Sequence, residues 1–102
     1  MGVKHLQTTL PRARRAQKSL YRPENKALSA SFRQIRLKTG LSQQEFGSLL
    51  GRNQSFVSAV ETGAIRLDAL QIRDWCDAAH VGMAAWLHLF EALLFDRSKT
   101  GD

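Results

Sequence analysis

Short amide and hydroxyl side chains are gathered where two predicted helices begin, in the segment SQQEFGSLLGRNQSFVSAVETG. Gln54 and Ser55 follow an asparagine, and Gln43 follows a serine, which are both favoured residues at a helix start. The second of these helices carries no charge before Glu61. Because a glutamine offers a donor and an acceptor together and a serine can act as either, these residues predict a surface that hydrogen-bonds to a polar partner.

Motifs of catalytic chemistry are missing from the sequence. It contains no nucleophile elbow, no phosphate-binding glycine loop and no paired carboxylates with a plausible pocket, so an enzyme is not expected. Cys76 and His80 are four residues apart and could share a helix face, but His88 lies on another predicted helix and His5 near the N-terminus. We therefore expect a packed thiol and a partly exposed histidine, with no metal and no cofactor.

The charge of the chain is distributed unevenly along its 102 residues. Residues 1–26 hold seven Lys and Arg and one acid, whereas residues 68–102 hold three bases and six acids. The net charge of +6 is thus concentrated at the front of the chain, which favours a polyanionic partner, usually nucleic acid. A basic segment that serves only solubility is the alternative. The single cysteine and the lack of a signal peptide fit a cytoplasmic protein.

Apolar residues at helical spacing, together with capping residues, predict an all-α domain of five helices and no strand. Residues 1–22 are expected to be a flexible basic arm, and residues 97–102 a tail, on either side of a domain at residues 23–96. Predicted helices cover residues 23–39, 42–50 and 53–62, a fourth begins at the capping residue Asp68, and a fifth covers residues 83–95. The apolar residues expected to face the core of the first four are Leu28, Phe32, Ile35, Phe46, Leu49, Leu50, Val57, Val60, Leu70, Ile72, Trp75 and Ala79.

The second and third helices are separated by a turn too short for an antiparallel hairpin, which indicates a helix-turn-helix at residues 42–62. The stretch GLSQQEFGSLLGRNQSFVSAVETGAIRLD resembles the helix-turn-helix of the phage-repressor and Cro-like family, often called the XRE family. Its matching elements include the Phe46-Gly47 pair, Gln54-Ser55 and Glu61. The resemblance extends over about residues 23–94 and implies a recognition helix that lies in the DNA major groove.

The resemblance implies separate roles for the polar side chains. Base contacts are expected from the recognition helix, at Gln54, Ser55, Ser58 and Ala59, and a glutamine suits the N6 and N7 atoms of adenine. Gln43 is expected to brace Gln54. Phosphate contacts are expected from Gln43, Ser42, Arg52, Arg66 and Arg33. The resemblance does not cover the arm, whose positive charge leads us to expect further contacts with DNA from Arg12, Arg14, Arg15 and Lys18.

Two charged residues fall on stripes that otherwise face inward, where an unpaired charge would be costly. These are Arg36 on the first helix and Glu61 on the third. The resemblance implies that they form a buried salt bridge, so their role is expected to be structural.

The fifth predicted helix, MAAWLHLFEALLF, has an unusually broad apolar face. Met83, Trp86, Leu87, Phe90 and Leu94 form the stripe expected to pack on the core. Such breadth suggests a partner, so Trp86, Leu89 and Leu93 are predicted to form a two-fold dimer interface. A wider core covered by the chain termini is the alternative.

These observations together predict a homodimeric, sequence-specific regulator of transcription that binds double-stranded DNA. A bacterial or phage repressor on a near-palindromic operator is the expected form. One alternative is an antitoxin that represses its own gene through the same domain and binds a toxin as its partner. Another is a nucleic-acid or RNA binder that is indifferent to sequence and driven by the arm, but it leaves the uncharged Gln54-Ser55 surface unexplained.

Overall fold

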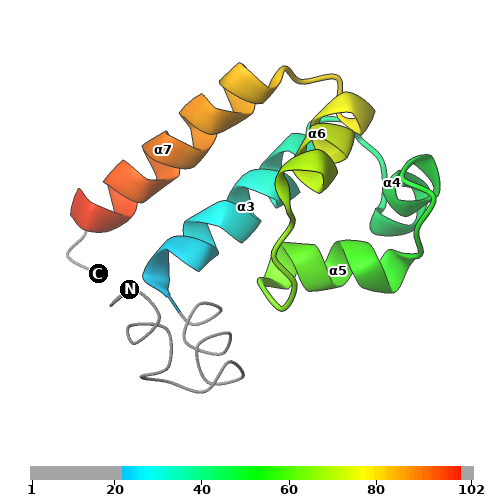
Figure 1. Cartoon of the computed structure of the whole chain (residues 1–102), viewed down its shortest axis with the longest axis horizontal. Helices are drawn as coiled ribbons and strands as arrows, with labels where there is room; N and C mark the ends of the chain where they lie inside the picture. Colours follow the sequence, from blue (N-terminus) through cyan, green and yellow to red (C-terminus); the bar gives the residue numbers. More distant parts are fainter. Residues whose placement is uncertain (1–21, 100–102) are drawn as a thin grey trace, which may run out of the picture.

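The structure is a computed structural model and describes residues 22–99, which form five α-helices (Figure 1). No strand occurs within these residues, so the predicted all-α fold with five helices is confirmed. The helices are α3 (Pro23–Leu37), α4 (Gln43–Leu49), α5 (Gln54–Thr62), α6 (Ala69–Ala78) and α7 (Met83–Lys99).

Capping side chains fix where the middle three helices begin. The Ser42 hydroxyl accepts a hydrogen bond from the Glu45 backbone N–H at the start of α4, and the Glu45 carboxylate accepts one from the Ser42 N–H. The Asn53 side chain caps α5 by accepting from the Phe56 N–H at 3.0 Å. Asp68 caps α6 in the same manner. Each cap satisfies backbone N–H groups that have no partner within the helix.

Two helix ends differ from the prediction. Helix α3 ends at Leu37, and the Thr39 hydroxyl instead donates to the Arg36 carbonyl oxygen at 2.6 Å just beyond that end. Helix α7 continues to Lys99, past the expected end at residue 95. The sequence has neither glycine nor proline between Met83 and Lys99, so nothing in the chain stops the helix earlier.

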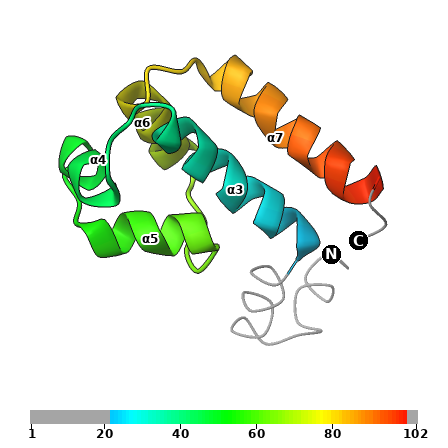
Figure 2. The same ribbon diagram turned by 180° about the vertical axis from the view of Figure 1, so that it is seen from behind.

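The helices are arranged around α3. Helix α7 runs alongside α3 in the opposite direction, while α4 and α5 lie together on the other side of the molecule (Figures 1 and 2). Helix α6 lies near the C-terminal end of α3 and connects the two groups. The result is one core shared by all five helices, so the helix-turn-helix pair and α7 pack on the same side chains.

A row of five aromatic rings forms the centre of this core. Neighbouring ring centroids are 4.9 Å apart for Phe46 and Trp75, 5.5 Å for Trp75 and Phe32, 5.5 Å for Phe32 and Trp86, and 5.9 Å for Trp86 and Phe90. The indole N–H of Trp75 donates to the Phe32 carbonyl oxygen at 3.1 Å. Because rings at these separations pack favourably, the row connects α4 to α7 through the middle of the domain.

Two leucines that were expected to be at least partly buried are exposed. Leu49 is 60% exposed and Leu70 is 71% exposed. Helix α4 has only seven residues, and Phe46 together with Leu50, just beyond its end, already occupies the side that faces the core. Leu70 lies in the first turn of α6, ahead of the turn that carries the buried Trp75. Helical spacing alone does not show which apolar residues the neighbouring helices will cover.

The core-facing side of α7 also differs from the predicted stripe. Trp86 is buried and Leu89 packs against the core, whereas Met83 is 40% and Leu87 46% exposed. The reason is the fit of Trp86, whose ring stacks on Phe32 and whose indole N–H needs a buried acceptor. Helix α7 is therefore turned so that Trp86 points into the core and the half-buried Leu89 packs against it.

Within residues 22–99, no single helix is both long and apolar enough to cross a membrane. Only α6 and α7 counted together reach that length and composition, and the pair is bent by 104°.

Candidate nucleic-acid interface

The turn between α4 and α5 depends on a close backbone approach at Gly47. A Cβ atom at this position would lie 3.0 Å from the carbonyl oxygens of both Arg52 and Asn53. The Arg52 N–H donates to the Gly47 carbonyl oxygen at 2.9 Å, so the turn is bonded directly to the helix that it crosses. A side chain at Gly47 would push α5 away from α4. The glycine thereby sets the angle at which α5 is presented.

Replacing Gly47 by alanine is expected to lower the free energy of unfolding by about 1–3 kcal/mol, because the added methyl group meets backbone atoms that cannot turn aside. Urea unfolding measures the loss. Ser48→Ala, at the exposed neighbouring position of α4, is the control and should change the stability by less than about 0.5 kcal/mol. Equal stabilities of the two variants would contradict the steric role of Gly47.

Arg36 and Glu61 form the buried ion pair that was expected between α3 and α5. The Arg36 Nε atom donates to Glu61 Oε2 at 2.6 Å, and one terminal nitrogen donates to Oε1 at 3.1 Å. The other terminal nitrogen donates to the Leu41 carbonyl oxygen at 2.7 Å. Only 8% of the Arg36 side chain and 2% of the Glu61 side chain are exposed. Two-point pairing with an additional carbonyl acceptor is the arrangement that makes such burial tolerable.

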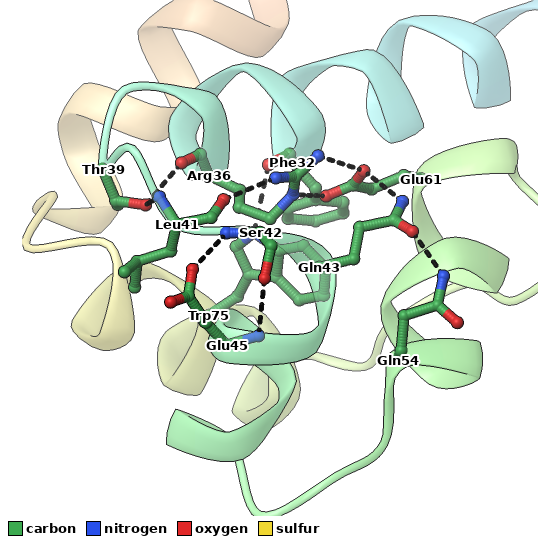
Figure 3. A network of polar contacts seen from close by, with 10 residues as sticks. All are labelled: Phe32, Arg36, Thr39, Leu41, Ser42, Gln43, Glu45, Gln54, Glu61 and Trp75. Atoms are coloured by element: carbon green, nitrogen blue, oxygen red, sulfur yellow. Dashed lines mark hydrogen bonds and ion pairs between the residues drawn. The ribbon is translucent and has the colours of Figure 1, made fainter.

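A chain of hydrogen bonds continues from this ion pair to the protein surface (Figure 3). Gln43 Nε2 donates to Glu61 Oε1 at 3.0 Å, and Gln54 Nε2 donates to Gln43 Oε1 at 2.6 Å. The expected brace between Gln43 and Gln54 is therefore present. The bond from Gln43 to Glu61 was not anticipated, although the inward position of Glu61 could have suggested it. We name Arg36, Glu61, Gln43 and Gln54 the polar relay.

The side chains expected to contact bases lie on one side of α5. Gln54 and Ser55 are exposed at its first turn, while Ser58 and Ala59 are partly exposed one turn later. The inner face of the same helix carries the buried Val57 and Val60. The exposed side of α5 thus offers amide, hydroxyl and methyl groups to a partner, with no charge among them.

The capping box at Ser42 also affects electrostatics at the edge of this surface. Hydrogen bonds from the backbone N–H and the hydroxyl of Ser42 hold the pKa of the Glu45 carboxyl below its usual value. The stabilisation from these bonds is therefore complete at neutral pH, and it is lost as the pH falls through that lowered pKa.

The arginine in the turn packs on an aromatic ring. The guanidinium carbon of Arg52 lies 3.8 Å from the centre of the Phe56 ring, which is a cation–π contact. A small hollow of about 50 Å³ is lined by both residues together with Leu50, Gln71, Asp74 and Trp75. Arg52 was predicted to contact phosphate, but its contact with Phe56 was not predicted, although the two residues are four apart in the sequence.

The remaining predicted phosphate ligands are not all brought together. Arg66 Nε donates to Asn25 Oδ1 at 3.4 Å, which connects it to the start of α3, where the Asn25 amide also donates to the Gly63 carbonyl oxygen. Arg33 is exposed on α3 and takes no part in the polar relay. Arg12, Arg14, Arg15 and Lys18 lie outside the described residues.

The pair that was considered for a metal does not converge. Cys76 is buried in the core, where burial raises the pKa of its thiol, and His80 is exposed with a left-handed backbone (φ 58°). Within residues 22–99, no three His, Cys, Asp or Glu side chains are grouped closely enough to hold a metal ion.

Comparison with known proteins identifies the fold and the family. The sequence pattern of the family described as "Helix-turn-helix domain" matches residues 27–89 of the chain. The crystal structure of the clp gene regulator ClgR from C. glutamicum is similar, with a TM-score of 0.64 and 20% sequence identity. That match covers 70% of this chain and 92% of the regulator. No protein with a curated description matches the sequence. Because the family match spans more than half of the chain, the chain belongs to the helix-turn-helix domain family, a family of DNA-binding domains.

Proposed function

We propose that this protein is a sequence-specific regulator of transcription that binds a near-palindromic DNA operator as a homodimer, most simply as a repressor. The observation that carries the proposal is the exposed first turn of α5, where Gln54 is held by the polar relay. A rigidly held amide can discriminate between base edges, because its donor and acceptor stay in place. A protein that relied on charge alone would have no use for this arrangement.

Phosphate contacts would set the position of α5 on the duplex without reading sequence. The candidates for these phosphate contacts that lie nearest to α5 in the sequence are Ser42 and Gln43, at the start of α4, and Arg52, in the turn. The stacking of Arg52 on Phe56 supports such a role, because a guanidinium held in place loses less entropy when it binds a phosphate. A cytoplasmic location agrees with this function.

Replacing Gln54 by alanine is expected to weaken binding to selected operator sites by about 1–3 kcal/mol, which is roughly 5- to 150-fold. Non-specific binding should stay the same, because the substitution removes base contacts and no charge. Selection of bound DNA from a random pool, run at two salt concentrations, identifies the sites, and titration of one selected site measures the loss.

The control for this experiment is Gln34→Ala, which removes an exposed glutamine of α3 that has no role in the proposed surface. Its affinity and its selected sequence should match those of the parent protein. If Gln54→Ala also kept the parent's operator discrimination, α5 would not be the helix that reads DNA.

Dimerisation is proposed through the exposed side of α7. Trp86 is buried and Leu89 packs against the core, so the large apolar side chains most exposed on α7 are Met83, at 40%, Leu87, at 46%, and Phe95, at 64%. The predicted interface residue Leu93 is half-buried on the same helix. A second copy would cover these side chains and place two recognition helices about one helical turn of DNA, ~34 Å, apart.

Sedimentation at micromolar concentration is expected to show a dimer, and Leu87→Glu is expected to convert it to a folded monomer, because a carboxylate would have to be buried in the interface. Gln44→Glu adds the same charge on α4 and should leave the dimer intact. A parent protein that stays monomeric in free solution and on DNA would exclude the dimer.

A further inference from the structure

The buried carboxylate of Glu61 determines which atom donates and which accepts in each hydrogen bond of the polar relay. Both carboxylate oxygens of Glu61 accept bonds from Arg36, and Oε1 accepts a further one from Gln43. A carboxylate offers no hydrogen to Gln43, so the atom of Gln43 that faces it must be the donor Nε2. The amide oxygen of Gln43 is thereby turned outward, toward α5.

The same constraint passes to Gln54. The outward oxygen of Gln43 accepts only, so Gln54 must present its own Nε2 to it, as it does at 2.6 Å. One N–H hydrogen of Gln54 is therefore consumed inside the protein. The amide has one N–H and the Oε1 acceptor left for a partner. The charge of a buried carboxylate thus decides the polarity of an exposed side chain through two amide groups.

The bases differ in how well they fit this polarity. In the major groove adenine presents an acceptor, N7, beside a donor, the N6 amino group, and both can be satisfied by one N–H and one oxygen. Guanine presents two acceptors, N7 and O6. Against guanine, the Oε1 atom of Gln54 would face an acceptor. A glutamine that could turn freely would avoid that conflict by directing its amino group at guanine.

We propose that Glu61, acting through Gln43, is a positioning residue that makes Gln54 select adenine and reject guanine at the base pair that it contacts. This inference rests on the proposed function, since it concerns how the same surface reads DNA. It adds a specificity role to an ion pair that otherwise serves only the fold. It also assigns to Gln43 the part of a polarity relay, in addition to any contact with phosphate.

Two substitutions of the half-buried Gln43 test the relay while keeping both Arg36 and Glu61 of the ion pair. Gln43→Met keeps a similar shape but removes both ends of the relay, so the Gln54 amide is released and the preference for adenine over guanine should fall from about tenfold to near unity. Gln43→Lys places a donor-only group between Glu61 and Gln54. Gln54 would then turn its oxygen inward and both hydrogens outward, and the preference should change to guanine.

Matched controls use the exposed neighbour Gln44, which takes no part in the relay. Gln44→Met and Gln44→Lys should leave the adenine-to-guanine ratio unchanged, even if the added lysine strengthens binding to all DNA. The measurement is the ratio of affinities for two operators that differ only at the base pair whose preference disappears in Gln54→Ala. A purely structural role for Gln43 would weaken both operators alike and would not change the ratio.

The outcomes separate the two proposals. Random-pool selection that enriches no sequence with the parent protein would remove the proposed function and this inference with it. Suppose that a defined operator is enriched but both Gln43 variants keep the parent's ratio of adenine to guanine affinity, or that the parent itself prefers guanine. Either result would overturn this inference and leave the proposed function intact. Loss of the preference in Gln43→Met together with its reversal in Gln43→Lys is the expected result.

Discussion

Replacing Glu61 by alanine is expected to lower the free energy of unfolding by about 3–5 kcal/mol, because it leaves the Arg36 guanidinium buried without its carboxylate partner. A domain of this size has a total stability of roughly 5–15 kcal/mol, so a large share of it would be lost. Urea unfolding followed by circular dichroism measures the change. The substitution would also remove the carboxylate to which Gln43 donates at the buried end of the polar relay.

Two controls separate the buried charge from other effects. Glu91→Ala removes an exposed carboxylate of α7 and should change the stability by less than about 0.5 kcal/mol. The double variant Arg36→Met with Glu61→Met removes both charges and should be much more stable than Glu61→Ala, because no unpaired charge remains in the core. If the double variant were as unstable as the single one, lost packing would be the cause.

Replacing Trp86 by alanine is expected to cost about 3–5 kcal/mol of stability and to detach α7 from α3. The Trp86 ring is stacked between Phe32 and Phe90, and its indole N–H donates to the Ser31 hydroxyl at 2.9 Å. The substitution would leave a cavity in the aromatic row that the rigid neighbours could fill only in part. Thermal unfolding of the parent and the variant at one concentration measures the loss.

The concentration dependence of this effect distinguishes a core residue from an interface residue. A tryptophan in the core should cost the same at low and high protein concentration, whereas one in a dimer interface should give a stable folded monomer. Leu87→Ala on the exposed side of the same helix should cost less than about 1 kcal/mol of monomer stability. Trp86→Phe keeps an aromatic ring in the stack but removes the hydrogen bond to Ser31. Its loss of stability should lie between those of Leu87→Ala and Trp86→Ala.

The positions at which the helices begin were largely determined by the local sequence. Ser42, Asn53 and Asp68 each carry a short side chain that can accept a hydrogen bond from a backbone N–H nearby, so the starts of α4, α5 and α6 could be recognised from residue type and spacing. The inward positions of Arg36 and Glu61 indicated that each charge needed a partner, and the resemblance to the repressor family implied that they pair with each other.

The sequence by itself therefore determined the five helices, the helix-turn-helix and the polar character of the exposed side of α5, since these follow from contacts within a few residues along the chain. Only the tertiary structure decided that Leu49 and Leu70 are exposed, that Trp86 and Leu89 face inward, and that Gln43 joins Glu61 to Gln54. Each of these depends on how one helix is turned against another. That rotation is set by ring stacking and by buried hydrogen bonds between residues far apart in the chain, which periodicity along one helix does not report.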